Sequence, residues 1–74
     1  MKVNKKKIFQ IVSKNVKIPL SNIGEDFSTE NIETWDSLAH VRIILELQKI
    51  TNIKIPTSSY GDFNSIEKLI KKFT

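Results

Sequence analysis

"ETWDSLAHVRIILEL", residues 33–47, leads from a polar segment into a stripe of apolar residues at helical spacing. Asp36 and Ser37 precede that stripe, and both are residue types favoured at a helix N-cap, where a side-chain oxygen accepts a hydrogen bond from a free backbone N–H. The pattern predicts a helix from Ser37 to about Thr51. The residues of its broad apolar face are Leu38, Val41, Ile43, Ile44, Leu45 and Leu47.

The size and composition of the chain favour an all-α fold. Its 74 residues make one small domain, 1–74, and a chain this short buries only a modest core. The absence of cysteine excludes disulfides and thiolate metal sites, and the one histidine excludes a histidine-based metal cluster, so we expect no metal. Two glycines and two prolines are few for a turn-rich β fold. Regular helices packed on one another are the remaining route to stability.

Three further segments have helical features. The first runs from Val3 to about Asn15. A short helical turn is expected near Pro56 to Tyr60, because proline suits the first position of a helix. The last helix is expected to begin at Asn64, which has the spacing of a capping box with Glu67. The residues expected on the buried sides of the first and last helices are Ile8, Ile11, Val12, Val16, Ile66, Leu69, Ile70 and Phe73.

A long loop separates the first two helices. Between Val16 and Trp35 the helical periodicity breaks, and proline, glycine, serine and asparagine are frequent. The loop also carries apolar side chains that can hold it against a core, so we expect it to be ordered; these are Ile18, Leu20, Ile23, Phe27, Ile32 and Trp35. The predicted fold is a small four-helix bundle of three main helices and one short helix, with this loop between the first and second.

The amino-terminal segment superficially suggests a signal peptide, because lysines are followed by apolar residues. Its apolar run is short, is interrupted by Gln10 and ends at Ser13 and Lys14. No run approaches the length of a membrane span. We therefore expect a cytoplasmic protein that does not enter a membrane.

Ser37 stands where the loop becomes the second helix. The start of a helix presents unpaired N–H groups and a partial positive charge, so a phosphate on this hydroxyl would be favoured. A hydroxyl at an exposed loop edge can also be reached by another enzyme. The chemistry permits a phosphoserine-type linkage at Ser37 and does not require one, since capping alone would explain the residue.

The segment WDSLAHVRIILELQKITNIKIP, residues 35–56, resembles the central part of an acyl carrier protein. In that family Asp-Ser-Leu opens the second helix, as Asp36, Ser37 and Leu38 do here. The resemblance covers the order of all four helices, the long loop and the Ile-x-Ile-Pro segment before the short helix. Three residues alone recur by chance, but this order of elements in a chain of this length is specific.

The resemblance implies that Ser37 carries a covalent phosphopantetheine arm, transferred from coenzyme A by a separate magnesium-dependent phosphopantetheinyl transferase. The thiol of the arm would hold an acyl or aminoacyl group as a thioester, which gives the chain a thiol without a cysteine. The protein would be no enzyme but a free-standing, monomeric carrier, as its start at Met1 also suggests. A loading ligase and a downstream transferase or synthase would use it in a specialised, fatty acid- or polyketide-like biosynthesis.

Two sets of residues are candidates for handling cargo and partners. An acyl chain gains about 0.8 kcal/mol for each methylene hidden from water. Candidates to line a slot for it, or simply to form core, are Ile44, Leu47, Ile53, Ile55 and Ile66. Candidates for partner recognition are Leu38, Val41, Arg42, Leu45 and Lys49.

The charge of the chain departs from the acidic character usual in the family. Residues 21–37 contain five acids and no basic residue, a charge of −5, so with +4 overall the remainder carries +9. The second helix has Arg42 and Lys49 and one acid, Glu46. Because like charges slow encounter and complementary charges speed it, we expect a dedicated partner.

Two other classes of function compete with the carrier hypothesis. A pI near 9.5 and lysines at both ends of the chain fit a basic helical nucleic-acid-binding module, although a single arginine and no aromatic ladder argue against it. A hydrolase would use Ser37, His40 and Asp36, but Asp36 is poorly placed to orient the imidazole. We expect His40 at the surface near the arm, and we expect Trp35 to anchor the loop by burying its ring.

Overall fold

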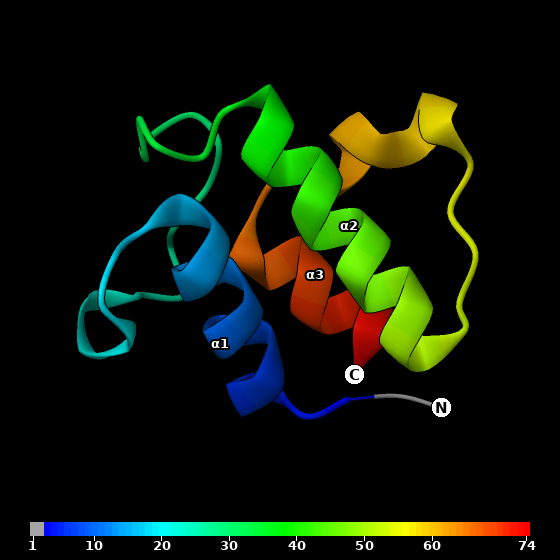
Figure 1. The fold of residues 1–74 in the computed structure, drawn as a ribbon, viewed down its shortest axis with the longest axis horizontal. Coiled ribbons are helices and arrows are strands. Elements are labelled where there is room, and N and C mark those ends of the chain that lie inside the picture. The colour runs from blue at the N-terminus through cyan, green and yellow to red at the C-terminus, as the bar shows by residue number, and fades with distance from the viewer. Residues whose placement is uncertain (1–2) are drawn as a thin grey trace.

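The computed structural model describes residues 3–74, and in this range the chain forms three α-helices and two 3₁₀ helices (Figure 1). In chain order these are α1 (Lys5–Val16), η1 (Leu20–Asn22), α2 (Ser37–Thr51), η2 (Thr57–Phe63) and α3 (Ile66–Phe73). The described residues contain no β-strand, and a single isolated bridge pairs Ser28 with Ser65. The predicted all-α bundle, with a long loop before α2, is confirmed.

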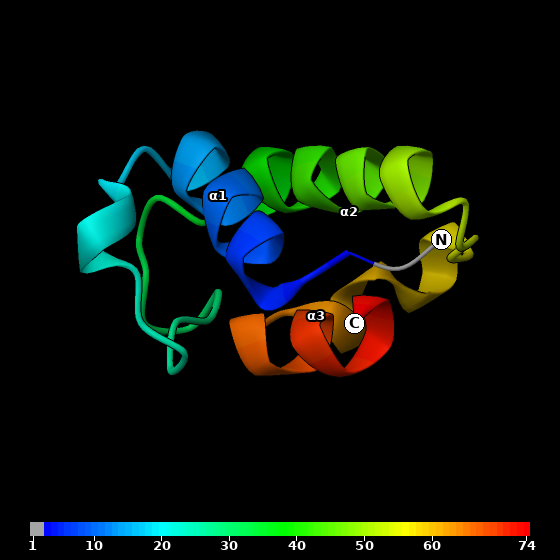
Figure 2. The same cartoon turned by 90° about the horizontal axis from the view of Figure 1, so that it is seen from below.

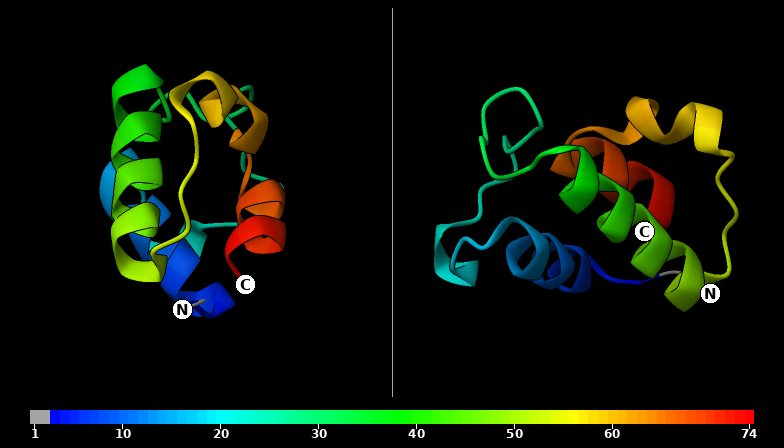
Figure 3. Two further views of the ribbon diagram at one scale, coloured as in Figure 1. Left: turned by 90° about the vertical axis from the view of Figure 1, so that its right-hand side faces the viewer. Right: turned by 45° about the horizontal axis from the view of Figure 1, so that its top comes forward.

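The helices are arranged around α1, which packs against both α2 and α3, while α3 also contacts η2. Figure 2 shows α1 and α2 on one side of the molecule and α3 on the other. Figure 3 shows α2 facing η2 and α3 across the molecule, joined by the extended segment that follows α2. The segment before α1 and the end of α3 meet where the Val3 N–H donates to the Phe73 carbonyl at 3.1 Å. In Figure 1 the end of α3 lies away from the start of α2.

The core is built from the apolar stripe of each α-helix together with three residues outside the helices, Ile23, Trp35 and Ile55. All expected core positions of the first and last helices are buried except Ile70, which is partly buried. From the loop, Ile23 and Trp35 are buried and Phe27 packs against the core, so the loop is held in place as predicted. Leu20 was expected to help, but it is 41 % exposed because it begins η1 at the surface.

Side-chain caps decide where each α-helix begins. Asn4 accepts a hydrogen bond from the Lys7 N–H at 2.8 Å, so α1 begins at Lys5 rather than at Val3. The helix ends at Val16, one residue later than expected, because Lys17 adopts a left-handed conformation with φ of 61°. Asn52 has the same conformation and ends α2 at Thr51, as predicted.

The start of α3 differs from the prediction. The helix begins at Ile66, and its cap is Ser65, whose Oγ accepts from the Lys68 N–H at 3.2 Å. Asn64 does not cap: its carbonyl accepts from the Thr29 N–H at 2.9 Å and its side chain from Lys68 Nζ. Contact with the loop also includes the bridge between Ser28 and Ser65, and Ser65 is extended, so α3 begins only at the next residue. The short helix is also displaced, since Pro56 lies directly before η2 rather than inside it.

The apolar residues of α2 divide between two faces. Ile43, Ile44 and Leu47 are fully buried and meet the rest of the core. Leu38, Val41 and Leu45 are exposed by 60, 38 and 52 %. The sequence pattern predicted one broad face from both sets, but only half of these residues are buried in the core.

This division predicts unequal costs for two similar substitutions on one helix. Leu47→Ala should lower the free energy of unfolding by about 2–5 kcal/mol, because it leaves a cavity in a close-packed core. Leu45→Ala, the matched control two residues away, should change it by about 0.5 kcal/mol or less. Urea unfolding followed by circular dichroism measures both. Equal costs for the two variants would contradict the observed packing.

Candidate functional site

Ser37 is exposed as the first residue of α2, and Asp36 is its N-cap. Asp36 Oδ1 accepts a hydrogen bond from the Ala39 N–H at 2.9 Å, and the Asp36 carbonyl accepts from the His40 N–H at the same distance. Within residues 3–74 the Ser37 side chain makes no hydrogen bond. Asp36 thus does the capping that either residue could have done, and it leaves the Ser37 hydroxyl free.

A buried hydrogen-bond chain lies beside Ser37. The Trp35 indole N–H donates to His40 Nδ1 at 3.1 Å, and His40 Nε2 lies 2.7 Å from the Tyr60 carbonyl. An indole N–H can only donate, so Nδ1 must accept, and the neutral ring therefore carries its proton on Nε2 and donates it to Tyr60. The chain links the end of the loop, α2 and η2 through one imidazole.

The burial of this chain corrects one sequence expectation and confirms another. His40 is only 8 % exposed, so it is not the surface residue that was expected. Its burial follows from the two partners that satisfy both ring nitrogens, since a buried polar ring needs them. Because both nitrogens are engaged, the proposed set of Ser37, His40 and Asp36 is not assembled for proton abstraction. Trp35 is fully buried, and its predicted role as the anchor of the loop is confirmed.

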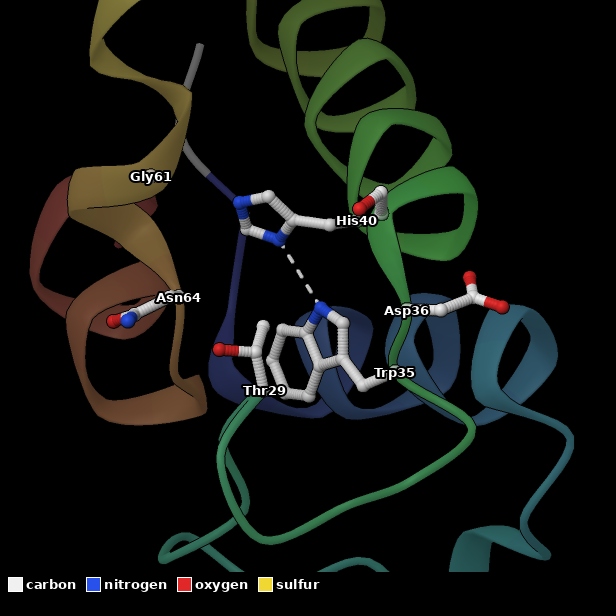
Figure 4. Close-up of a pocket in the computed structure, with 7 residues that line it drawn as sticks. Thr29, Trp35, Asp36, His40, Gly61 and Asn64 are labelled. Carbon is white, nitrogen blue, oxygen red and sulfur yellow. Dashed lines mark hydrogen bonds between the residues drawn. The ribbon is translucent and has the colours of Figure 1, made fainter.

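One pocket, of about 430 Å³, opens next to Ser37 on the side facing η2 (Figure 4). The rings of Trp35 and His40 point toward one another inside it, whereas the Asp36 carboxylate points the opposite way. Its lining residues come from the loop, the start of α2 and the segment from η2 to α3: Thr29, Trp35, Asp36, Ser37, His40, Gly61 and Asn64. The walls combine aromatic faces with hydroxyl and amide groups.

A smaller pocket, of about 170 Å³, lies on the other side of Asp36 between the end of α1 and the start of α2. Leu38 lines it, and so do the cationic residues Lys17 and Arg42. The start of α2 is therefore flanked by two hollows of different character, a polar and aromatic one toward η2 and a cationic one toward α1.

The residues predicted for partner recognition all lie on the surface of α2. Leu38, Val41, Arg42, Leu45 and Lys49 are exposed and follow one another at helical spacing; we call this set the α2 face. It begins one residue after Ser37.

Four of the residues predicted to line an acyl slot belong to the core, and the fifth packs against it. Ile44, Leu47 and Ile66 are fully buried, Ile55 is almost so, and Ile53 packs against them. The structure brings the five together in one cluster, but the two pockets beside Ser37 are lined by other residues.

Three ion pairs join charged side chains within the described range. Lys5 pairs with Glu25 at 2.6 Å, Lys14 with Glu46 at 2.8 Å, and Lys71 with Glu67 at 3.4 Å. Lys5 and Lys71 are among the lysines that suggested nucleic-acid binding, and both are partly neutralised by these contacts.

Two features of the site have no signal in the sequence. The Tyr60 carbonyl is a backbone acceptor that any residue could supply, and only the path of η2 brings it to His40. Gln48 is the second such feature: its side chain accepts from the Ile55 N–H at 2.7 Å and donates to the Tyr60 hydroxyl at 3.2 Å. These bonds hold the segment after α2, and with it the wall of the larger pocket.

Neither the protein-family models nor the curated proteins compared with this sequence match it. Within residues 3–74, no helix has both the length and the apolar character needed to cross a membrane. The same residues form no group of three or more histidine, cysteine or acidic side chains able to hold a metal ion.

The hydrogen-bond chain predicts a single tautomer and a measurable coupling. In ¹⁵N NMR of the neutral ring, His40 should have a protonated Nε2 and an unprotonated Nδ1. His40→Phe should lower the free energy of unfolding by about 1–3 kcal/mol, because it leaves the Trp35 indole N–H without an acceptor.

The double variant Trp35→Phe/His40→Phe isolates the bond itself. Once His40 is gone, removing the indole N–H should cost less than it does in the wild type, with a coupling of about 0.5–3 kcal/mol. Additive costs, or an Nδ1-protonated ring, would show that the bond is absent in solution.

Proposed function

We propose that this chain is a carrier protein whose Ser37 hydroxyl holds a phosphopantetheine arm. The observation that carries the proposal is the division of roles at the start of α2, where Asp36 caps the helix and Ser37 remains exposed without a hydrogen bond. A serine that served only as a cap would have its oxygen turned onto the backbone. The Asp-Ser-Leu resemblance, on residues 36–38, agrees with this reading.

The first turn of α2 suits a phosphate on Ser37. The N–H groups at the start of a helix lack intrahelical partners and carry partial positive charge, which favours an attached phosphate. Asp36 occupies the Ala39 N–H with its carboxylate, and this carboxylate points away from the larger pocket (Figure 4). The modified side chain could therefore extend over that pocket without passing a negative charge there.

The larger pocket fits the near part of such an arm. A pantetheine chain contains amides and hydroxyls as well as methylenes, and the pocket offers Thr29 and Asn64 beside the aromatic rings of Trp35 and His40. When bound, the arm would supply a thiol that holds cargo as a thioester. The residues of this chain would orient the arm, and separate enzymes would carry out the reactions.

The proposal includes the setting of these reactions. A transferase would form the phosphate bond to the Ser37 oxygen as the pyrophosphate bond of coenzyme A breaks; the adenosine bisphosphate half of coenzyme A would leave, and a base of the transferase would take the hydroxyl proton. A ligase would load an acyl or aminoacyl group, and a synthase or transferase would remove it. We propose a monomer that acts in the cytoplasm, where coenzyme A is supplied, and that serves a specialised biosynthesis, since the positive charge of α2 is unusual for the resembled family.

Intact-protein mass spectrometry tests the proposal. Incubation with a broad-specificity phosphopantetheinyl transferase, magnesium and coenzyme A should add one phosphopantetheine mass, and peptide mapping should locate it at Ser37. Ser37→Ala should abolish the gain. Ser58→Ala, which removes an exposed serine from η2, is the matched control and should be modified like the wild type. An unchanged mass, or modification elsewhere, would overturn the proposal.

The division of roles also predicts different effects on stability. Asp36→Ala should lower the free energy of unfolding by about 1 kcal/mol through loss of the cap. Ser37→Ala should change it by about 0.5 kcal/mol or less, because an exposed side chain without partners is removed. Thermal and urea unfolding of both variants measure the difference. A larger cost for Ser37→Ala than for Asp36→Ala would mean that Ser37 is the structural residue.

A further inference from the structure

The α2 face carries unpaired positive charge next to exposed apolar side chains. Glu46, the one acid of α2, is half-buried and paired with Lys14 of α1 at 2.8 Å. Of the ion pairs among residues 3–74, none includes Arg42 or Lys49. The free charge along the α2 face is therefore positive, and it lies among Leu38, Val41 and Leu45.

The smaller pocket extends this character beyond the helix. Lys17, directly after α1, lines it together with Leu38 and Arg42 of the α2 face. Asp36 is the one acid of the lining, and its carboxylate is engaged by the Ala39 N–H. A group that enters beside Leu38 thus meets two cations and an apolar surface.

We propose that the α2 face docks into an apolar groove rimmed by acidic side chains, and that the transferase which modifies Ser37 has such a groove. The inference rests on the proposed function, because an enzyme that reaches Ser37 must cover the residues directly after it. Burial of the leucines supplies the attraction, and complementary charge speeds encounter and fixes orientation.

The sign of the charge distinguishes this surface from that of the acyl carrier proteins which the sequence resembles. Those proteins usually present acids on the second helix to basic patches of their partners. Here a basic rim would oppose Arg42, Lys49 and Lys17 and would slow association, whereas an acidic rim would pair with them.

One transferase in two versions tests the proposal. The first version carries glutamates around the groove that receives the carrier, and the second carries lysines at the same positions. The rate of arm transfer to Ser37, measured as kcat/KM at low salt, should be about tenfold higher for wild type with the glutamate-rimmed enzyme. Arg42→Glu/Lys49→Glu should reverse the preference, and Arg42→Gln/Lys49→Gln should remove most of it.

Lys68→Glu/Lys72→Glu is the matched control. It makes the same change in net charge on exposed residues of α3, which lies across the molecule from α2 (Figure 3). It should keep the wild-type preference, and circular dichroism should show that all variants are folded.

Three results would overturn the inference. The first is a preference of wild type for the lysine-rimmed enzyme, and the second is an equal shift of the preference by the α2 and α3 variants. Either result would mean that the α2 face does not bind an acidic groove, while the carrier function would remain supported. If neither enzyme modifies any variant, the carrier function fails and the inference fails with it.

Discussion

The hydrogen bonds from the Trp35 indole through the His40 imidazole to the Tyr60 carbonyl tie the end of the loop and the start of α2 to η2, twenty residues further along the chain. An indole can only donate and a carbonyl can only accept, so a neutral imidazole bonded to both in this way has one allowed tautomer. The loop therefore ends, α2 begins and η2 passes at fixed positions relative to one another. Ser37 lies between Trp35 and His40 in the chain, so its position depends on this arrangement.

The start of α2 separates two tasks that a single residue often combines. Asp36 satisfies the Ala39 N–H, and a carboxylate at this point also interacts favourably with the helix dipole. The Ser37 hydroxyl is then not needed to cap the helix. A change at this hydroxyl therefore breaks none of the hydrogen bonds that hold the start of α2.

The two faces of α2 show how a small domain divides its apolar residues. Ile43, Ile44 and Leu47 supply the core, while Leu38, Val41 and Leu45 remain on the surface at the cost of exposing apolar area. A chain of 74 residues has a modest core, so three apolar side chains left in contact with water are a substantial loss of buried area. Its position next to Ser37, with positive charge around it, is consistent with a surface that a partner covers.

The sequence by itself determined the class of fold, the extent of α2 and the anchoring of the loop by Trp35, because apolar periodicity and a large ring carry those signals locally. It also pointed to Asp36 and Ser37 together, but it left open which of them caps the helix.

The tertiary structure determined that Asp36 is the cap. It also determined that His40 is buried, because one of its ring nitrogens bonds a carbonyl twenty residues away. Because Asn64 bonds to Thr29 of the loop, α3 begins at Ile66 rather than at the predicted Asn64. The packing of α2 into the core, in which it contacts α1, determined which half of its apolar residues is buried. These outcomes depend on which segments meet in space, and a local pattern does not contain that information.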